Sequence, residues 1–243
     1  MRPGCIRRFF RALIHLTVLR PAVKLFCGVH VSGWENLHSL DRFIIIANHN
    51  SHLDTLLLFY LLSVRDIAVT HPVAEETYFN RSRIVFALVR FAFQPVWVQR
   101  GRAGKQEGAM SAMKEKLDAG HNLIVFPEGT RGAPGELLPF KSGVGRLVSQ
   151  YPRIPIVPVF LSGAERVLPK MTMLPLPFWS QVVVGPAQMC SGSHRDITEQ
   201  LQTTCLEKQP AASRSRSGTK PARFPAAPGR TWFPGPVFCD HSR

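Results

Sequence analysis

The sequence predicts an α/β fold, with a single domain built on a largely parallel central sheet flanked by helices and preceded by an N-terminal amphipathic helix. Three observations lead to this prediction. Short apolar runs alternate with segments of helical periodicity, the middle of the chain is close to neutral, and both ends are cationic. Alternating strands and helices favour parallel pairing, because each helix returns the chain to the same end of the sheet.

Charge divides the 243 residues into three parts with a net charge of +14. Residues 1–30 hold six basic and no acidic side chains, and residues 31–207 hold 17 basic and 15 acidic ones. Residues 208–243 hold seven basic side chains and one acidic side chain. Cationic ends suit an anionic surface, either phospholipid or nucleic acid. We therefore predict a membrane-association helix over residues 1–27, a globular domain over 28–207 and a disordered basic tail over 208–243.

The N-terminal segment 5–19 fits an amphipathic helix. Its apolar arc, about 120° wide on a helical wheel, consists of Ile6, Phe9, Phe10, Leu13 and Leu16. The opposite side consists of Arg7, Arg8, Arg11 and His15. The segment is either a helix lying in a bilayer interface or an ordinary surface helix packed on the domain. We expect no spanning helix, because no apolar run approaches roughly 18–20 residues, and no signal peptide, because arginines interrupt the apolar stretch.

The remaining elements follow from short β-branched runs, which predict strands, and from 3.6-residue periodicity, which predicts helices. The predicted strands cover residues 42–47, 67–73, 95–98, 122–126, 155–160 and 181–184. The predicted helices cover residues 52–64, 81–91, 104–119, 144–150 and 196–207. Ligands of parallel α/β sheets bind at the carboxyl ends of strands and in the loops that follow. A motif that carries chemistry should therefore come directly after a strand.

The first such motif runs from Asn48 to Asp54, directly after the strand 42–47. A histidine with a carboxylate in reach can act as a general base, because its pKa lies near working pH and the carboxylate fixes its tautomer. Positions i and i+5 diverge by about 140° on one helix, so His49 must lie in the loop and Asp54 in the helix. Two alternatives stay open, a helix-start role for Asp54 with a merely structural histidine, and a metal site formed with His52.

Two further motifs suit phosphate binding. Arg100 follows a short predicted strand and precedes a helix, where a cation and backbone N–H groups favour an anion, although a solvated basic turn would look the same. The segment 126–132 follows the strand 122–126, and Gly129 permits a tight turn there. Arg131 can bind phosphate through two parallel hydrogen bonds, and Glu128 can orient it or bind substrate hydroxyls.

In this order the motifs resemble those of the glycerolipid acyltransferase family, typified by lysophosphatidic acid acyltransferase. The resemblance covers roughly residues 28–186, and the matching segments are 31–37 (a lead-in strand), 48–54, Arg100, 126–131 and 154–159. The segment before Arg100, Phe93 to Gln99, departs from the glycine and Phe-Ile often found in the family. Each motif alone is weak, whereas the ordered set is specific.

The resemblance makes 28–207 an acyltransferase domain with His49 as base and Asp54 as its partner. It implies an acyl-CoA or acyl-carrier-protein donor and a lysophospholipid acceptor, most directly 1-acylglycerol-3-phosphate. Residues expected around the acceptor phosphate are Arg100, Glu128, Gly129, Thr130 and Arg131. We expect no cofactor, no metal and no nucleic-acid partner, and association with the cytoplasmic face of a membrane. The alternatives are another acceptor such as glycerol-3-phosphate, a thioesterase using the same site, and a non-enzymatic membrane- or nucleic-acid-binding protein.

Overall fold

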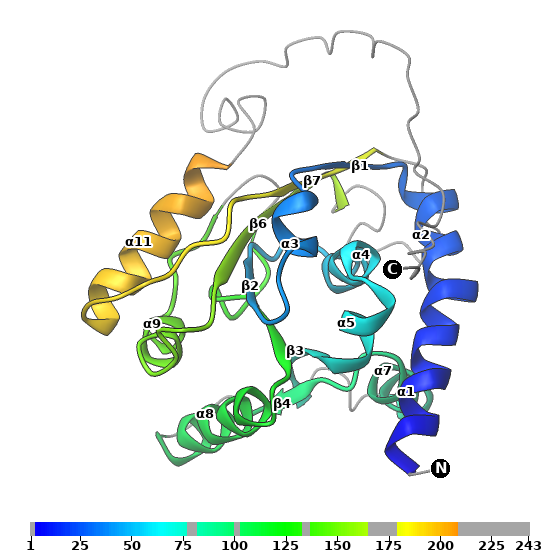
Figure 1. Cartoon of the computed structure of the whole chain (residues 1–243), viewed down its shortest axis with the longest axis horizontal. Helices are drawn as coiled ribbons and strands as arrows, with labels where there is room; N and C mark the ends of the chain where they lie inside the picture. The colour runs from blue at the N-terminus through cyan, green and yellow to red at the C-terminus, as the bar shows by residue number, and fades with distance from the viewer. Residues whose placement is uncertain (1–2, 77–81, 100–102, 133–136, 165–178, 209–243) are drawn as a thin grey trace, which may run out of the picture.

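A computed structural model describes residues 3–76, 82–99, 103–132, 137–164 and 179–208. Within these segments a seven-stranded sheet has the order β1-β7-β6-β2-β5-β3-β4 (Figure 1). The strands are β1 (Val29–Ser32), β2 (Ile44–Ala47), β3 (Thr70–Glu75), β4 (Val96–Val98), β5 (Asn122–Val125), β6 (Ile156–Ser162) and β7 (Ser180–Val184). The predicted α/β fold with a largely parallel sheet is confirmed.

The direction of the strands brings the first motif (48–54) and the third motif (126–132) to one edge of the sheet. β2 pairs in parallel with both β5 and β6, and β3 pairs in parallel with β5 and β4. β7 runs antiparallel to β6 and parallel to β1. Because β2 and β5 are parallel neighbours, the loops that follow them lie side by side.

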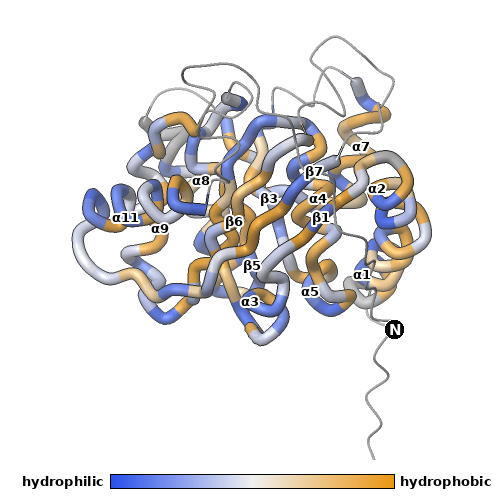
Figure 2. Tube along the Cα trace, turned by 90° about the horizontal axis from the view of Figure 1, so that it is seen from above, coloured by the Kyte–Doolittle hydropathy of each residue, from blue (hydrophilic) through white to orange (hydrophobic). Residues whose placement is uncertain are grey.

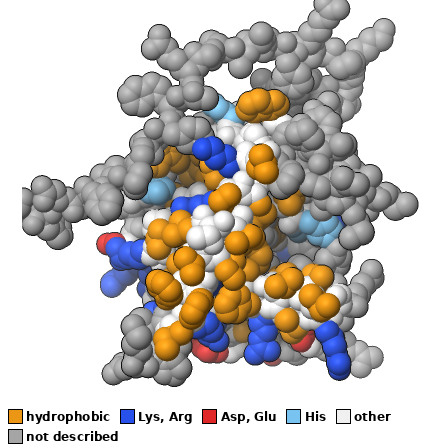
Figure 3. Space-filling view, turned by 90° about the vertical axis from the view of Figure 1, so that its right-hand side faces the viewer, with side chains coloured by type: hydrophobic (Ala, Val, Ile, Leu, Met, Phe, Trp, Pro, Cys, Tyr) orange, Lys and Arg blue, Asp and Glu red, His pale blue; other side chains and the backbone are white. Residues whose placement is uncertain are grey.

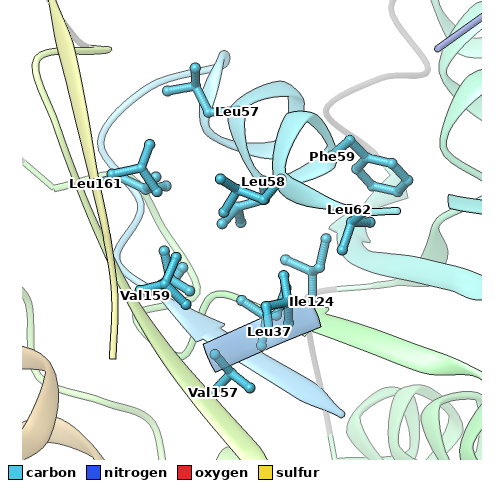
Figure 4. Close-up of a cluster of buried hydrophobic side chains, with 14 of the residues drawn as sticks. Leu37, Leu57, Leu58, Phe59, Leu62, Ile124, Val157, Val159 and Leu161 are labelled. Carbon is cyan, nitrogen blue, oxygen red and sulfur yellow. The ribbon is translucent and has the colours of Figure 1, made fainter. Parts of the chain in front are cut away.

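Helices cover both faces of the sheet (Figure 1). They are α1 (Pro3–Ile14), the π-helical turn η1 (His15–Leu19), α2 (Arg20–Cys27), α3 (Glu35–His38), α4 (Asp54–Leu61), α5 (Val64–Val69), α7 (Arg83–Ala92), α8 (Ala103–Asp118), α9 (Gly143–Val148) and α11 (His194–Glu207). On one face α4 contributes Leu57, Leu58 and Phe59 to a buried cluster that includes residues of α2 and α5 (Figure 4). On the other face α8, α9 and α11 form a second cluster. The hydrophobic strands between these layers run through the middle of the molecule (Figure 2).

Several element boundaries differ from the sequence predictions. Residues 67–69 are helical rather than extended, because the Ser63 hydroxyl caps α5 by accepting the Asp66 N–H. The expected lead-in strand 31–37 ends at Ser32, and α3 follows. The N-terminal helix continues past residue 19 to Cys27, with η1 directly before Pro21, where the missing proline N–H interrupts the α-helical hydrogen bonding.

The N-terminal helix packs on the domain through part of its basic side. Arg11 and His15 are 0% and 1% exposed, whereas the five residues of the predicted apolar arc are 38% to 64% exposed. A surface helix usually buries its apolar arc against the domain, whereas here that arc faces outward. No helix among the described residues is both long and apolar enough to cross a bilayer. Of the predicted disordered tail, all but Lys208 lies outside the described residues.

Candidate active site

His49 and Asp54 meet at the end of β2. Asp54 is the first residue of α4, and His49 lies in the loop before it, as the i to i+5 spacing requires. The imidazole Nδ1 donates to Asp54 Oδ2 over 2.9 Å, with the carboxylate fully buried and the His49 side chain 23% exposed. Donation through Nδ1–H leaves the lone pair on Nε2, which is the nitrogen that could take a proton from a substrate.

Asp54 also closes the loop that carries His49. Its Oδ2 accepts the backbone N–H groups of Asn50 over 2.7 Å and of Ser51 over 2.8 Å, in addition to the imidazole. Its other oxygen, Oδ1, is buried and has no hydrogen-bond partner among the described residues. One carboxylate oxygen therefore both orients the His49 ring and shapes the loop. The two roles considered for Asp54, partner of His49 and helix-start residue, occur together.

The start of this loop is fixed to the sheet by Asn48. The Asn48 amide donates to the Leu161 carbonyl over 2.8 Å and accepts the Leu161 N–H over 2.7 Å, which extends the pairing of β2 with β6 by one residue. The His49 ring stacks on Phe126, at the end of β5, with centroids 4.3 Å apart. Both contacts restrict the direction in which His49 points.

The third motif holds the His49 backbone on both sides. Glu128 Oε1 accepts the His49 N–H over 2.9 Å, and Gly132 N–H donates to the His49 carbonyl over 2.9 Å. Glu128 Oε2 accepts the Leu138 N–H over 3.1 Å, so the buried carboxyl group joins two loops. The predicted contact of Glu128 with substrate stays a prediction, whereas its link to the first motif was missed from the sequence.

Burial raises the pKa of Glu128 to about 7, although the His49 and Leu138 N–H groups oppose the shift. A carboxyl group whose pKa is higher in the folded state stabilises the fold below its unfolded pKa, and this contribution is lost as pH rises towards the folded value. We expect Glu128→Gln to lower the free energy of unfolding at pH 5 by about 1–3 kcal/mol, because glutamine offers one acceptor oxygen to two N–H donors. The difference in the free energy of unfolding between the variant and wild type should be about 2 kcal/mol smaller at pH 8, where Glu128 of the wild type has lost its proton.

Urea denaturation of wild type and Glu128→Gln at both pH values measures this change. Glu107→Gln, at an exposed position on α8, is the matched control and should show no narrowing. A Glu128→Gln deficit that is the same at pH 5 and pH 8 would contradict a raised pKa.

Positive charge gathers around the turn of the third motif. Gly129 has φ +64°, and Lys141 lies so close that a β-carbon at Gly129 would be 2.5 Å from the lysine Nζ. Arg131 donates from Nη1 to His52 Nε2. Burial lowers the pKa of His52 and the Arg131 guanidinium lowers it further, so neutral His52 serves as acceptor. In this arrangement His52 Nε2 faces Arg131, which does not fit a metal shared with His49.

The predicted phosphate residues fall into two groups. Gly129, Arg131 and exposed Thr130 lie on the turn that follows β5, next to the His49 loop. Arg100 lies outside the described residues. Sequence reasoning missed Lys141, because the Gly- and Pro-containing segment after Gly132 gives no periodicity that would return residue 141 to the turn.

Residues 28–162 match the protein family described as Acyltransferase. The chain belongs to this acyltransferase family. Similar curated proteins include 1-acyl-sn-glycerol-3-phosphate acyltransferase of Limnanthes alba, 30% identical over 141 residues, covering 56% of this chain and 46% of that protein. Taffazin of Dictyostelium discoideum is 32% identical over 158 residues, covering 60% and 54%. The chain thus spans about half the length of the curated relatives it matches.

A solved structure shares the fold. The crystal structure of the 1-acyl-sn-glycerophosphate (LPA) acyltransferase PlsC from Thermotoga maritima matches with a TM-score of 0.67 and 23% identity. The match covers 91% of this chain and 86% of that chain. At this identity the likeness establishes the architecture and not the substrates.

Proposed function

We propose that this acyltransferase moves a fatty acyl group from an acyl thioester, acyl-CoA or acyl-carrier protein, to a hydroxyl of a glycerol-phosphate lysolipid. The observation that carries the proposal is the 2.9 Å contact of His49 Nδ1 with the fully buried Asp54 carboxylate at the end of a parallel strand. The names of the relatives favour 1-acylglycerol-3-phosphate as acceptor, with phosphatidic acid as product.

The reaction needs only the groups at this site. His49 Nε2 takes the proton of the acceptor hydroxyl, and the hydroxyl oxygen attacks the thioester carbonyl carbon. The imidazolium that forms faces the buried Asp54 carboxylate, which stabilises its charge. Collapse of the tetrahedral intermediate breaks the carbon–sulfur bond, and His49 returns its proton to the departing thiolate. No covalent acyl-enzyme is required, because the thioester is already activated.

The acceptor phosphate binds at the turn after β5. Arg131 supplies two donors in a fixed fork, and Lys141 adds a point charge beside Gly129. Glycine at position 129 lets the Lys141 side chain approach the turn, and Arg100 and Thr130 complete the predicted set. The turn lies on the same edge of the sheet as His49, which supports a phosphate site there.

Arg131→Ala should therefore raise KM for lysophosphatidic acid by about 10- to 100-fold, the value of a charge-assisted hydrogen bond. It should leave KM for the acyl thioester within about twofold, because the two substrates are bound by different groups. Steady-state kinetics with each substrate varied in turn separates the two constants. Equal increases in both KM values would show that Arg131 does not bind the acceptor phosphate.

An acceptor screen tests the function itself. The protein is incubated with a radiolabelled acyl-CoA and, in separate arms, lysophosphatidic acid, glycerol-3-phosphate, lysophosphatidylcholine or no acceptor. The proposal expects labelled phosphatidic acid in the first arm. Label found only in free fatty acid, at equal rates in every arm, would identify a thioesterase instead.

The lysolipid acceptor places the enzyme at a membrane surface, on the cytoplasmic face, where the acyl thioester is supplied. Two features of the N-terminal helix support this location. Its apolar arc faces outward, and residues 3–27 contain no acidic side chain.

A further inference from the structure

Helix α7 is an apolar helix that is largely exposed in the described part of the chain. Eight of its ten residues are apolar, yet only Ala92 is buried. Ile84, Val85, Leu88 and Phe91 are each between 39% and 74% exposed. Exposing this much apolar surface in water is unfavourable, at about 25 cal/mol per Å², and contiguous apolar patches on a protein mark interaction sites.

Two buried polar side chains fix α7 beside α1. Arg11 donates from Nε to the Ala92 carbonyl over 3.0 Å and from Nη2 to the Phe93 carbonyl over 2.9 Å, at the C-terminal end of α7. His15 Nε2 donates to the Ala92 carbonyl over 2.8 Å. Arg11 Nη2 also reaches the Thr70 carbonyl on β3 over 2.6 Å. The basic side of α1 is thus used to hold α7, and both helices turn their apolar residues outward.

Burying the charged Arg11 side chain has a free-energy cost, which its hydrogen bonds in this orientation of α1 offset. Burial lowers the pKa of Arg11 to about 9, with a contribution from nearby Arg7, so the guanidinium is still charged at neutral pH. A buried charge without hydrogen bonds would cost several kcal/mol. Here carbonyl groups accept its hydrogen bonds and the centre of the Phe59 ring lies 5.4 Å away, so this orientation accommodates the charge.

The charges around the two helices identify what covers them. Residues 3–27 and 82–93 contain seven Arg and Lys side chains and no Asp or Glu. Beside α7, a hollow of about 380 Å³ is lined by Arg7, Arg90 and Lys116, with Glu76 as its acid, which accepts from Gln99. Figure 3 shows hydrophobic side chains gathered on this side of the molecule, with Lys and Arg side chains among them and at the margins. An apolar surface combined with cationic side chains matches acyl chains beneath anionic headgroups.

We propose that α1 and α7 together form a single docking face for an anionic phospholipid bilayer, with α7 as a second contact that the N-terminal helix alone does not provide. The apolar residues of both helices enter the interface, and Arg7 and Arg90 bind headgroup phosphates. This inference rests on the proposed function for its choice of a lipid partner. It adds that membrane binding depends on the folded domain and not only on the N-terminal segment.

The full chain is tested by co-sedimentation with vesicles of phosphatidylcholine alone or mixed with phosphatidylglycerol. Ile84→Asp/Leu88→Asp on α7 and Phe9→Asp/Phe10→Asp on α1 should each lower partitioning onto mixed vesicles by roughly 100-fold. Leu206→Asp, an exposed leucine on α11 at the other side of the molecule, is the matched control and should bind as wild type does (Figure 1). Arg7→Gln/Arg90→Gln should lower binding to mixed vesicles and leave binding to phosphatidylcholine unchanged.

Wild-type binding by the α7 variant, with binding lost in the α1 variant, would overturn the proposal and leave α1 as the contact. A wild-type dimer in sedimentation velocity that Leu88→Asp dissociates, with vesicle binding unchanged, would also overturn it in favour of a second copy of this chain. Circular dichroism melts confirm that each variant is folded, as expected for exposed positions. Acyl transfer to a short-chain, monomeric lysolipid is measured in parallel. If wild type transfers no acyl group to this lysolipid, the proposed function is refuted, whereas the result of the vesicle experiment still stands.

Discussion

Replacing His49 with alanine is expected to lower kcat for acyl transfer by about 10³-fold or more, the contribution of a positioned general base. The side chain holds no structural element in place by itself, because the backbone of residue 49 carries the bonds to Glu128 and Gly132. The variant should therefore fold, bind vesicles and keep its KM values within a few-fold. Acyl transfer is measured with acyl-CoA and the best acceptor from the screen.

His30→Ala provides the matched control for this variant, since His30 is exposed on the edge strand β1. It should transfer acyl groups at the wild-type rate. Added imidazole should restore part of the activity of His49→Ala, because the space beside Phe126 and Asp54 is left empty. Transfer by His49→Ala within tenfold of wild type would refute the proposed base.

Asp54→Asn should lower kcat by about 10²- to 10³-fold while leaving the fold intact. All three donors, the His49 ring and the N–H groups of Asn50 and Ser51, bind Oδ2. An asparagine oxygen in that place can accept all three, and its amide nitrogen then takes the position of the unpartnered Oδ1. The variant thus removes the charge and keeps the geometry, so its loss of activity measures the stabilisation of the imidazolium.

Asp54→Ala separates the electrostatic role from the structural one. It leaves the two backbone N–H groups without an acceptor, which should lower the free energy of unfolding by about 2–4 kcal/mol. Asp54→Asn keeps an acceptor for the two backbone N–H groups but places its amide nitrogen at a buried position without an acceptor, so it should lose about 1–2 kcal/mol in the same urea denaturation experiment. Wild-type kcat in Asp54→Asn, together with an unstable Asp54→Ala, would reduce Asp54 to a helix-start residue that only shapes the loop.

The first motif could be derived from the sequence because its constraint is local. A buried β-branched strand ending at Ala47 and a helix beginning at Asp54 leave His49 in the connecting loop, and only that placement lets the two side chains meet. The third motif could be located for the same reason, as a glycine turn after a strand. The parallel direction of β2 and β5 follows from the alternation of strands and helices, whereas their adjacency in the sheet, which brings the two motifs together, does not.

The links between the motifs could not be derived in this way. Glu128 reaches the His49 N–H, Asn48 reaches Leu161, and Lys141 lies over Gly129 across 12 positions of the chain. Each of these contacts depends on register and loop path, which composition and periodicity do not encode. The boundary at residues 67–69 was wrong for a related reason, since the same apolar run suits a short helix once Ser63 caps it.

The sequence by itself determined the fold class, the positions of the motifs and the amphipathic character of the N-terminal helix, because all three follow from periodicity along a single element. The tertiary structure decided which side of that helix meets the domain. A helical wheel gives two faces but not their neighbours, and the usual expectation buries the apolar one. Here the carbonyls of Thr70, Ala92 and Phe93 accept the Arg11 guanidinium. Arg11 and His15 are therefore buried against the domain, Arg7 and Arg8 stay exposed, and the apolar side, with α7, faces outward.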